Sequence, residues 1–172
     1  MFSGQLHELF LHEVCALGDA GKLEELGSFV RKSKLDVNIR DEDWKNKTAL
    51  HWAAGKGHAR CVKLLLEYGA NPGAKMVGGW TPAHCAAETG RYNVLKVLVD
   101  HHAPVTLPDD SGDTPKRVAE IYGHTDCLEL LCSAETNENQ RKHFVKDKFR
   151  SQTRKISRMV DTKDQQAPAV LD

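Results

Sequence analysis

The feature of this 172-residue sequence that most constrains its fold is a threonine, an alanine and a glycine that recur together every 33 residues. The recurring positions are Thr48, Ala53 and Gly57, then Thr81, Ala86 and Gly90, then Thr114, Ala119 and Gly123. An earlier copy, FLHEVCALGDAGKLEELGSFV, lies 39 residues before the next, which indicates a six-residue insertion between the two. A fixed period of this length predicts a stack of similar units, each of which buries its apolar face only against its neighbours.

Each copy has the pattern of two short helices. The threonines stand where a first helix begins, and Pro82 and Pro115 follow in its first turn. The recurring glycines mark the end of that helix, where a left-handed residue is needed. Segments such as CVKLLLEY then predict a second helix, because their apolar residues follow i, i+3, i+4 spacing. Two residues before the threonines, Gly79, Gly112 and Asn46 predict hairpin turns with positive φ.

The period and the segments TALHWAA, TPAHCAA and TPKRVAE resemble the ankyrin-repeat family over roughly residues 6–132. The resemblance implies an all-α solenoid of about four helix–turn–helix units joined by hairpin loops, followed by a basic C-terminal tail. We expect an ankyrin-repeat domain over residues 1–132, with units at about 6–42, 43–75, 76–108 and 109–132. Residues 133–172 are expected to form a polar linker and a basic tail that is partly helical or disordered.

Histidines that recur with the period raise the question of a metal site. His51 and His84 stand at the histidine of the TPLH-like motif, which in ankyrin repeats hydrogen-bonds within and between hairpin loops. The alternative is metal binding, because Cys85 follows His84, although neighbouring residues point to different faces of a helix. His58 and His124 follow the helix-ending glycines and are also assigned to the scaffold. We predict no metal site, since the cysteines show no CxxC pair.

Motifs of catalysis and membrane insertion are not found. The sequence has no GxSxG, P-loop, GxGxxG or HExxH pattern, so we predict no enzyme, no catalytic residue and no cofactor. It has no basic leader with a long apolar stretch and no run of about 18 apolar residues, so we expect neither a secretory signal nor a transmembrane segment. A reducing, cytoplasmic location fits the five cysteines, which we interpret as packing residues.

The candidate binding residues lie where ankyrin repeats vary, at the hairpin tips and just before the helix-ending glycines, which the family geometry places on one concave face. The predicted partner-binding residues are Trp44, Lys45, Lys47, Lys56, Trp80, Glu88, Thr89, Asp110, Asp113 and Tyr122. Trp44 and Trp80 are candidate anchors, because tryptophan is enriched in binding hot spots. The alternative is that Trp44 folds over the inserted loop and Trp80 over a neighbouring hairpin. Trp52 is expected in the core.

A basic segment follows the repeats at residues 141–158. Its eight basic residues are Arg141, Lys142, Lys146, Lys148, Arg150, Arg154, Lys155 and Arg158. Asp147 is its one acidic residue, and the whole chain has 24 basic and 24 acidic residues, so the rest of the chain is acidic. A basic amphipathic helix here would dock on a partner groove, an anionic membrane or an acidic polymer, and the alternative is a solvated tail.

The function that these features predict is that of a non-catalytic adaptor. Its concave ankyrin face would bind another protein, and its basic tail would form a second contact. The alternative is a structural filament-associated protein, microtubule or ciliary, whose tail binds an acidic surface in the cilium or cytoskeleton. We do not expect nucleic-acid binding, because the body is acidic and no aromatic–basic module is present.

Overall fold

The computed structural model describes residues 11–24 and 36–137. Residues 1–135 form one compact unit and residues 136–172 a second. The basic segment at residues 141–158 lies outside the described residues, as does part of the expected first repeat.

Short helices alternate with loops along the described chain. The helices are α3 (Ala49–Lys56), α4 (Ala59–Glu67), α5 (Pro82–Glu88), α6 (Tyr92–Asp100) and α7 (Pro115–Ile121), with further helical residues at 11–17, 20–24 and 125–137. The loop before α3 forms a small hairpin of β1 (Arg40–Asp41), the 3-10 helix η1 (Glu42–Trp44) and β2 (Lys47–Thr48). Its strands are antiparallel, with Arg40 opposite Thr48. This architecture confirms the predicted all-α ankyrin-repeat fold.

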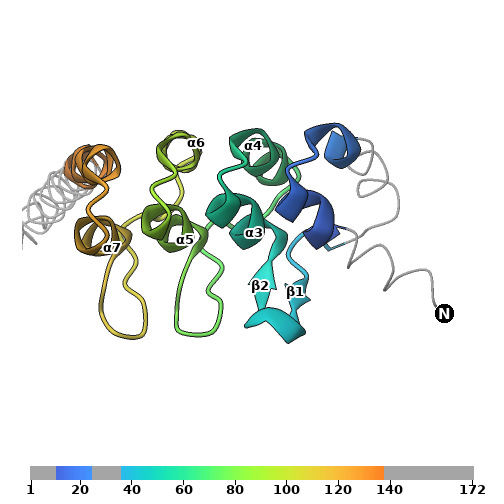
Figure 1. Ribbon diagram of the computed structural model, residues 1–172, viewed down its shortest axis with the longest axis horizontal. Helices are drawn as coiled ribbons and strands as arrows, with labels where there is room; N and C mark the ends of the chain where they lie inside the picture. Colours follow the sequence, from blue (N-terminus) through green and yellow to red (C-terminus); the bar gives the residue numbers. More distant parts are fainter. Residues whose placement is uncertain (1–10, 25–35, 138–172) are drawn as a thin grey trace, which may run out of the picture. The chain divides into compact units, whose positions relative to one another are not determined.

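The helices of the repeat unit form two rows, with the loops on one side (Figure 1). Helix α5 contacts both α3 and α7 in the first row, and α4 contacts α6 in the second. The recurring alanines Ala53, Ala86 and Ala119 are fully buried, which lets the backbones of the first-row helices approach one another closely. The loops before α5 and α7 extend from the first row on the same side as β1 and β2 (Figure 1).

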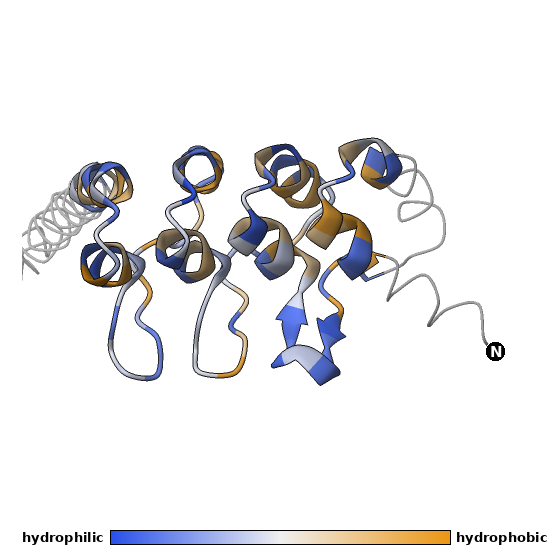
Figure 2. Cartoon of the chain, viewed as in Figure 1, coloured by the Kyte–Doolittle hydropathy of each residue, from blue (hydrophilic) through white to orange (hydrophobic). Residues whose placement is uncertain are grey.

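Apolar residues of the second row supply much of the core. The fully buried residues of α4 and α6 are Cys61, Val62, Leu65, Val94, Leu95 and Leu98. Each leucine or valine buried in this way contributes about 1.5–3 kcal/mol to folding. The helices carry hydrophobic and hydrophilic residues around their axes, whereas the β1–β2 hairpin is hydrophilic (Figure 2). The hairpin therefore owes its position to polar contacts rather than to the core.

The cysteines pack as expected. Four of the five free cysteines are buried and Cys132 is partly buried. Burial raises the pKa of the Cys85 thiol to about 12, so this side chain stays protonated and packs as a small apolar group.

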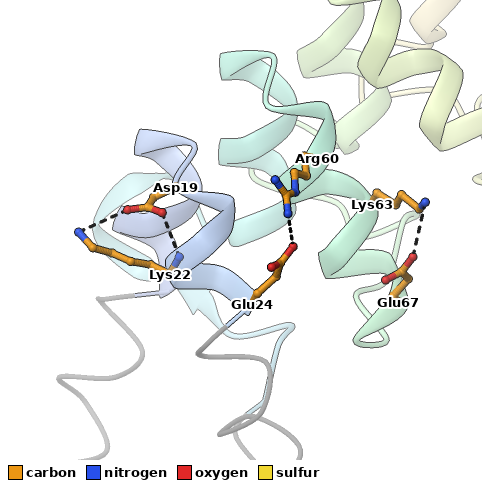
Figure 3. A network of polar contacts seen from close by, with 6 residues as sticks. All are labelled: Asp19, Lys22, Glu24, Arg60, Lys63 and Glu67. Carbon is orange, nitrogen blue, oxygen red and sulfur yellow. Dashed lines mark hydrogen bonds and ion pairs between the residues drawn. The ribbon is translucent and has the colours of Figure 1, made fainter.

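Exposed ion pairs lie on the surface of the second-row helices (Figure 3). Arg60 of α4 lies 2.6 Å from Glu24 of the helix at residues 20–24, and this ion pair links two neighbouring repeats. Lys22 pairs with Asp19 at 3.4 Å, within the earlier repeat. Such solvent-exposed pairs contribute about 0–1 kcal/mol each, so they orient this surface more than they stabilise it.

The last described helix is longer than the sequence suggested. Residues 133–137 were expected to begin a polar linker, but they continue the helix that starts at residue 125. Ala134 packs against the core and Glu135 pairs with Lys116 of α7 at 2.8 Å. Composition alone did not indicate this extension, because it depends on contacts with α7, the first helix of the same repeat.

The turn between the two helices of a repeat is covered by the next repeat. His58 Nε2 lies 3.2 Å from the Ala16 carbonyl, and His124 Nε2 lies 2.9 Å from the Glu88 carbonyl. Gly90 has φ +65°, and a Cβ there would lie 2.6 Å from Nδ1 of His124. The recurring glycine therefore provides both a left-handed turn and space for the histidine that follows in the next unit.

Replacing Gly90 with alanine is expected to destabilise the protein by more than the backbone strain alone. The left-handed conformation costs an alanine about 1–2 kcal/mol. Displacing His124 from the Glu88 carbonyl adds about 1 kcal/mol. Gly123→Ala is the matched control, because Gly123 has φ +75° with no atom within 4 Å of the added Cβ. Urea unfolding measures both variants, and equal losses would contradict the role given to His124.

Candidate functional site

A series of histidine hydrogen bonds fixes the hairpin loops on which the candidate site is built. Nε2 of His51 lies 3.0 Å from the Trp80 carbonyl, and Nε2 of His84 lies 3.0 Å from the Asp113 carbonyl. Nε2 of His12 lies 3.2 Å from the carbonyl of Ile39, which precedes the β1–β2 hairpin. Each histidine thus contacts the loop that follows its own repeat. This confirms the scaffold interpretation of His51 and His84.

Both ring nitrogens of these histidines are in use. The Thr48 N–H donates to Nδ1 of His51 at 3.2 Å, and the Thr81 N–H donates to Nδ1 of His84 at 3.1 Å. Since Nδ1 accepts, the proton of the neutral ring is on Nε2, which donates to the carbonyl of the next loop. Burial lowers the pKa of His51 to about 4 and also lowers the pKa of His84. Neither nitrogen of His84 is left to join Cys85 in holding a metal.

Backbone bonds join one hairpin tip to the next. The Val77 N–H donates to the Lys45 carbonyl at 2.9 Å, and the Asp110 N–H donates to the Gly78 carbonyl at 3.2 Å. These two bonds are related by the 33-residue period, so the three tips are held in the same relative register.

The tips turn as the sequence predicted. Asn46, Gly79 and Gly112 have φ of 57°, 77° and 90°, so all three adopt the left-handed conformation. Lys45 also has a positive φ, of 60°. This conformation is unusual for lysine, and it places Lys45 at the turn of the β1–β2 hairpin.

Trp80 is held by the hairpin that follows it. Its Nε1–H donates to Asp109 Oδ2 at 3.0 Å, and its ring stacks on His84 with the centroids 5.9 Å apart. Burial acts to raise the pKa of Asp109, but the bonds from Asp113, Ser111 and Trp80 outweigh it, so the pKa is lowered. Trp80 is partly buried and packs against the core. Trp80 therefore packs over the neighbouring hairpin, which is one of the two alternatives that the sequence left open.

A groove of about 700 Å³ lies along the hairpin tips and the first-row helices. Its lining residues are Asp43, Trp44, Lys45, Lys47, Met76, Val77, Gly78, Trp80, Cys85, Glu88 and Tyr122. Six of the ten predicted partner-binding residues are among them: Trp44, Lys45, Lys47, Trp80, Glu88 and Tyr122. The structure therefore brings together residues from three repeats that the sequence singled out separately.

The other four predicted residues do not line the groove. Lys56 is exposed at the end of α3, and Thr89 is exposed with its hydroxyl 2.9 Å from the Cys85 carbonyl. Asp110 is exposed, and Asp113 is partly buried, with its carbonyl bonded to His84. Three of these residues have backbone or side-chain bonds that serve the scaffold.

An aromatic cluster forms one end of the groove. Trp44 is 60% exposed, and its ring meets Trp52 edge-on, with the centroids 5.8 Å apart. The ammonium of Lys47 lies over the Trp52 ring, 4.3 Å from its centroid. Trp52 was expected in the core, but it is partly exposed beneath these two side chains. That expectation was wrong, because the residue after the motif histidine faces the groove side of α3.

Nε1 of Trp52 is a buried donor without a partner among the described residues. An unsatisfied buried donor of this kind costs about 1–3 kcal/mol. No carboxylate of residues 11–24 or 36–137 forms an ion pair with Lys45 or Lys47. The two lysines at this end of the groove thus have no carboxylate partner in the part of the chain that the structure describes.

Five lining residues are not among the predicted ones: Val77 and Gly78 lie at a predicted hairpin tip, whereas sequence reasoning missed Asp43, Met76 and Cys85. A signal for Cys85 was available, since it stands 33 residues after Trp52 and next to His84. A helix neighbour of an inward-facing histidine points to another face, so both positions should have been assigned to the groove. Met76 offered no such signal, because its position depends on the hairpin register.

A second hollow, of about 380 Å³, lies on the second-row helices. It is lined by Tyr92, Asp126, Glu129, Leu130 and Ser133. None of the predicted binding residues lies there.

The described chain shows neither a membrane span nor a metal cluster. Over residues 11–24 and 36–137, no helix combines the length and apolarity needed to cross a bilayer. In the same residues, no three metal-ligating side chains gather at one point.

Acidification is expected to weaken the fold through the motif histidines. The pKa of His51 falls from its ordinary 6.5 to about 4 on folding, so protonation favours the unfolded chain. The stabilisation that comes from the neutral His51 ring should be fully present above pH 6.5 and decrease as the pH falls toward 4. At pH 5 the free energy of unfolding should be lower by about 2 kcal/mol from His51 alone. Urea unfolding at pH 7 and pH 5 measures this loss. His51→Gln should be less stable at pH 7 but change less with pH, and an equal change would refute the assignment.

The two groove tryptophans should differ in their effect on stability. Trp80→Ala removes a partly buried ring and the bond to Asp109, and should cost about 2–3 kcal/mol. Trp44→Ala loses an edge-on aromatic contact, worth about 0.5–1.5 kcal/mol, but admits water near the unpaired Trp52 N–H. Its net cost should be below about 1 kcal/mol. Urea unfolding followed by circular dichroism compares them, and a larger loss for Trp44→Ala would be inconsistent with this ranking.

Known proteins match the chain over its repeats. Glycerophosphocholine phosphodiesterase GDE1 of Candida albicans is 38% identical over 107 residues, which is 62% of this chain and 9% of that protein. Protein phosphatase 1 regulatory subunit 27 of Homo sapiens is 36% identical over 95 residues, or 55% of this chain and 60% of that protein. Protein phosphatase 1 regulatory subunit 12A of Mus musculus is 33% identical over 115 residues, or 58% of this chain and 11% of that protein.

The chain covers less than two thirds of the length of each of these relatives. The family model described as ankyrin repeats (3 copies) matches residues 11–109 and 73–142, which together make up most of the chain. With the stacked helix pairs, the positive-φ hairpin turns and the histidine bonds between loops, this match shows that the chain belongs to the ankyrin-repeat family.

Proposed function

We propose that this protein is a non-catalytic adaptor that binds another protein in the groove along its hairpin tips. The observation that carries the proposal is the exposure of large aromatic side chains in that groove. Trp44 is 60% exposed and Tyr122 53% exposed, and both line the same hollow. Aromatic side chains of this kind bury a large area at low entropic cost when a partner covers them.

The relatives favour a regulatory rather than a catalytic role. Two of them are named as regulatory subunits of a protein phosphatase, which is consistent with repeats that act by binding. The third is named as a phosphodiesterase, but this chain matches only 9% of its length. A match confined to repeats does not carry over the activity of the remaining 91%.

A narrower relationship is part of the proposal. The stretches DEDW, ALHWAA, GWTPAH and GDTPKR resemble ankyrin repeat domain-containing protein 66, a small member of the family. The likeness adds no activity.

The basic tail is proposed as a second contact. Its eight cations at residues 141–158 would aid the encounter with an acidic partner, and the effect would weaken with salt. The alternative function rests on the same charges: a microtubule or ciliary filament surface would bind the tail, and the repeats would be an accessory. Both versions place the protein in the cytoplasm or on its cytoskeleton.

Affinity purification with four forms of the full chain tests the adaptor role. The groove variant combines Trp44→Ala with Tyr122→Ala, and Tyr92→Ala is its matched control, since Tyr92 is an exposed tyrosine outside the groove. A fourth form lacks residues 138–172. The adaptor proposal expects partners that Tyr92→Ala and the tail deletion retain and the groove variant loses, by about tenfold or more in affinity.

The filament alternative expects the reverse pattern. Co-sedimentation with polymerised tubulin would then persist in the groove variant, disappear on removal of residues 138–172 and fall steeply with salt. Partners that bind the groove variant as well as the wild type would overturn the adaptor proposal.

A further inference from the structure

We propose, on the basis of the adaptor function above, that the groove selects partner segments in which an acidic side chain stands beside a bulky apolar one. The acidic group would meet Lys45 and Lys47, and the apolar group would cover Trp44 and Val77. The occupant is thus a segment of another protein, defined by its chemistry.

The cations at the first hairpin are the first part of the argument. Lys45 and Lys47 line the groove, and neither has an ion-pair partner among the described residues. Asp43 and Glu88 line the same groove, yet neither forms an ion pair with Lys45 or Lys47. The groove therefore keeps its own carboxylates apart from these cations, which leaves both ammonium groups available to an incoming anion.

The position of Lys47 is fixed rather than free. Its ammonium lies 4.3 Å from the centroid of the Trp52 ring, and its backbone belongs to β2. An ammonium over an indole face loses part of its hydration, so a carboxylate that approaches it gains more than at an isolated surface lysine.

The apolar half of the preference comes from the tips of the first two hairpins. Trp44 is 60% exposed and Val77 57% exposed, and both line the groove. Trp44 directly precedes Lys45 in the chain. The bond from the Val77 N–H to the Lys45 carbonyl holds these two tips together. An apolar side chain laid across them would be followed, one residue away, by a group within reach of the cations.

The experiment selects binders from a random peptide library displayed on phage, with the full chain as bait. Each enriched peptide is synthesised twice, as selected and with Asp→Asn or Glu→Gln at its acidic positions. Fluorescence anisotropy then measures both forms against the wild type, the Lys45→Gln, Lys47→Gln double variant and the control Lys56→Gln. Lys56 is an exposed lysine at the end of α3 that does not line the groove.

We expect strong coupling between the loss of the peptide's acidic group and the loss of the two lysines. The amide peptide should bind the wild type about tenfold or more weakly than the acidic peptide, and the double variant should show a loss of similar size. The amide change should then have little further effect on the double variant, and Lys56→Gln should leave both affinities unchanged.

The outcomes separate this inference from the adaptor proposal. Peptides whose affinity falls in the Trp44→Ala, Tyr122→Ala variant but is unchanged in the lysine double variant would overturn the acidic preference. The groove would then remain a docking surface. Enriched peptides that bind the Trp44→Ala, Tyr122→Ala variant as well as the wild type would contradict both proposals, as would a selection that enriches no peptide. Urea unfolding of each variant confirms that the affinities refer to folded protein.

Discussion

The rest of the structure depends on one hydrogen bond, from the Nε2–H of a motif histidine to the carbonyl that ends the following loop. The bond requires a neutral ring, and the threonine N–H at Nδ1 enforces the tautomer that can donate. Because the loops extend away from the two rows of helices, this contact fixes positions that helix packing alone would leave undefined (Figure 1). The groove exists because successive hairpins are held in one register.

The repeat scaffold was predictable because its rules act locally. The helix-starting threonines, the left-handed glycines and the buried alanines each satisfy a backbone or packing requirement that recurs with the period. Six groove residues were also within reach, since they occupy positions not needed for stacking. Trp52 and residues 133–137 could not be assigned correctly from composition. Their surroundings depend on which faces α3 and α7 turn toward other segments.

The candidate site differs from the later hairpins in the residues at its first tip. Trp44 and Lys45 stand where the next loop has Val77 and Gly78 and where the last loop has Asp110 and Ser111. Trp80 has a different role in the groove, because its indole N–H donates a hydrogen bond to Asp109 and its ring forms part of the groove wall. The groove is therefore part scaffold and part open surface, and only the second part is available for recognition.

The histidine bonds also give the stack a direction. For His12, His51 and His84 the histidine precedes the carbonyl that it contacts in the sequence. The last repeat, after which the described residues contain no further hairpin, has Arg117 at the motif position. A ribosome delivers the chain from the N-terminal end, so each new loop emerges after the imidazole that will receive it. Assembly can consequently proceed in the order of synthesis, with every unit serving as the template for the one made next.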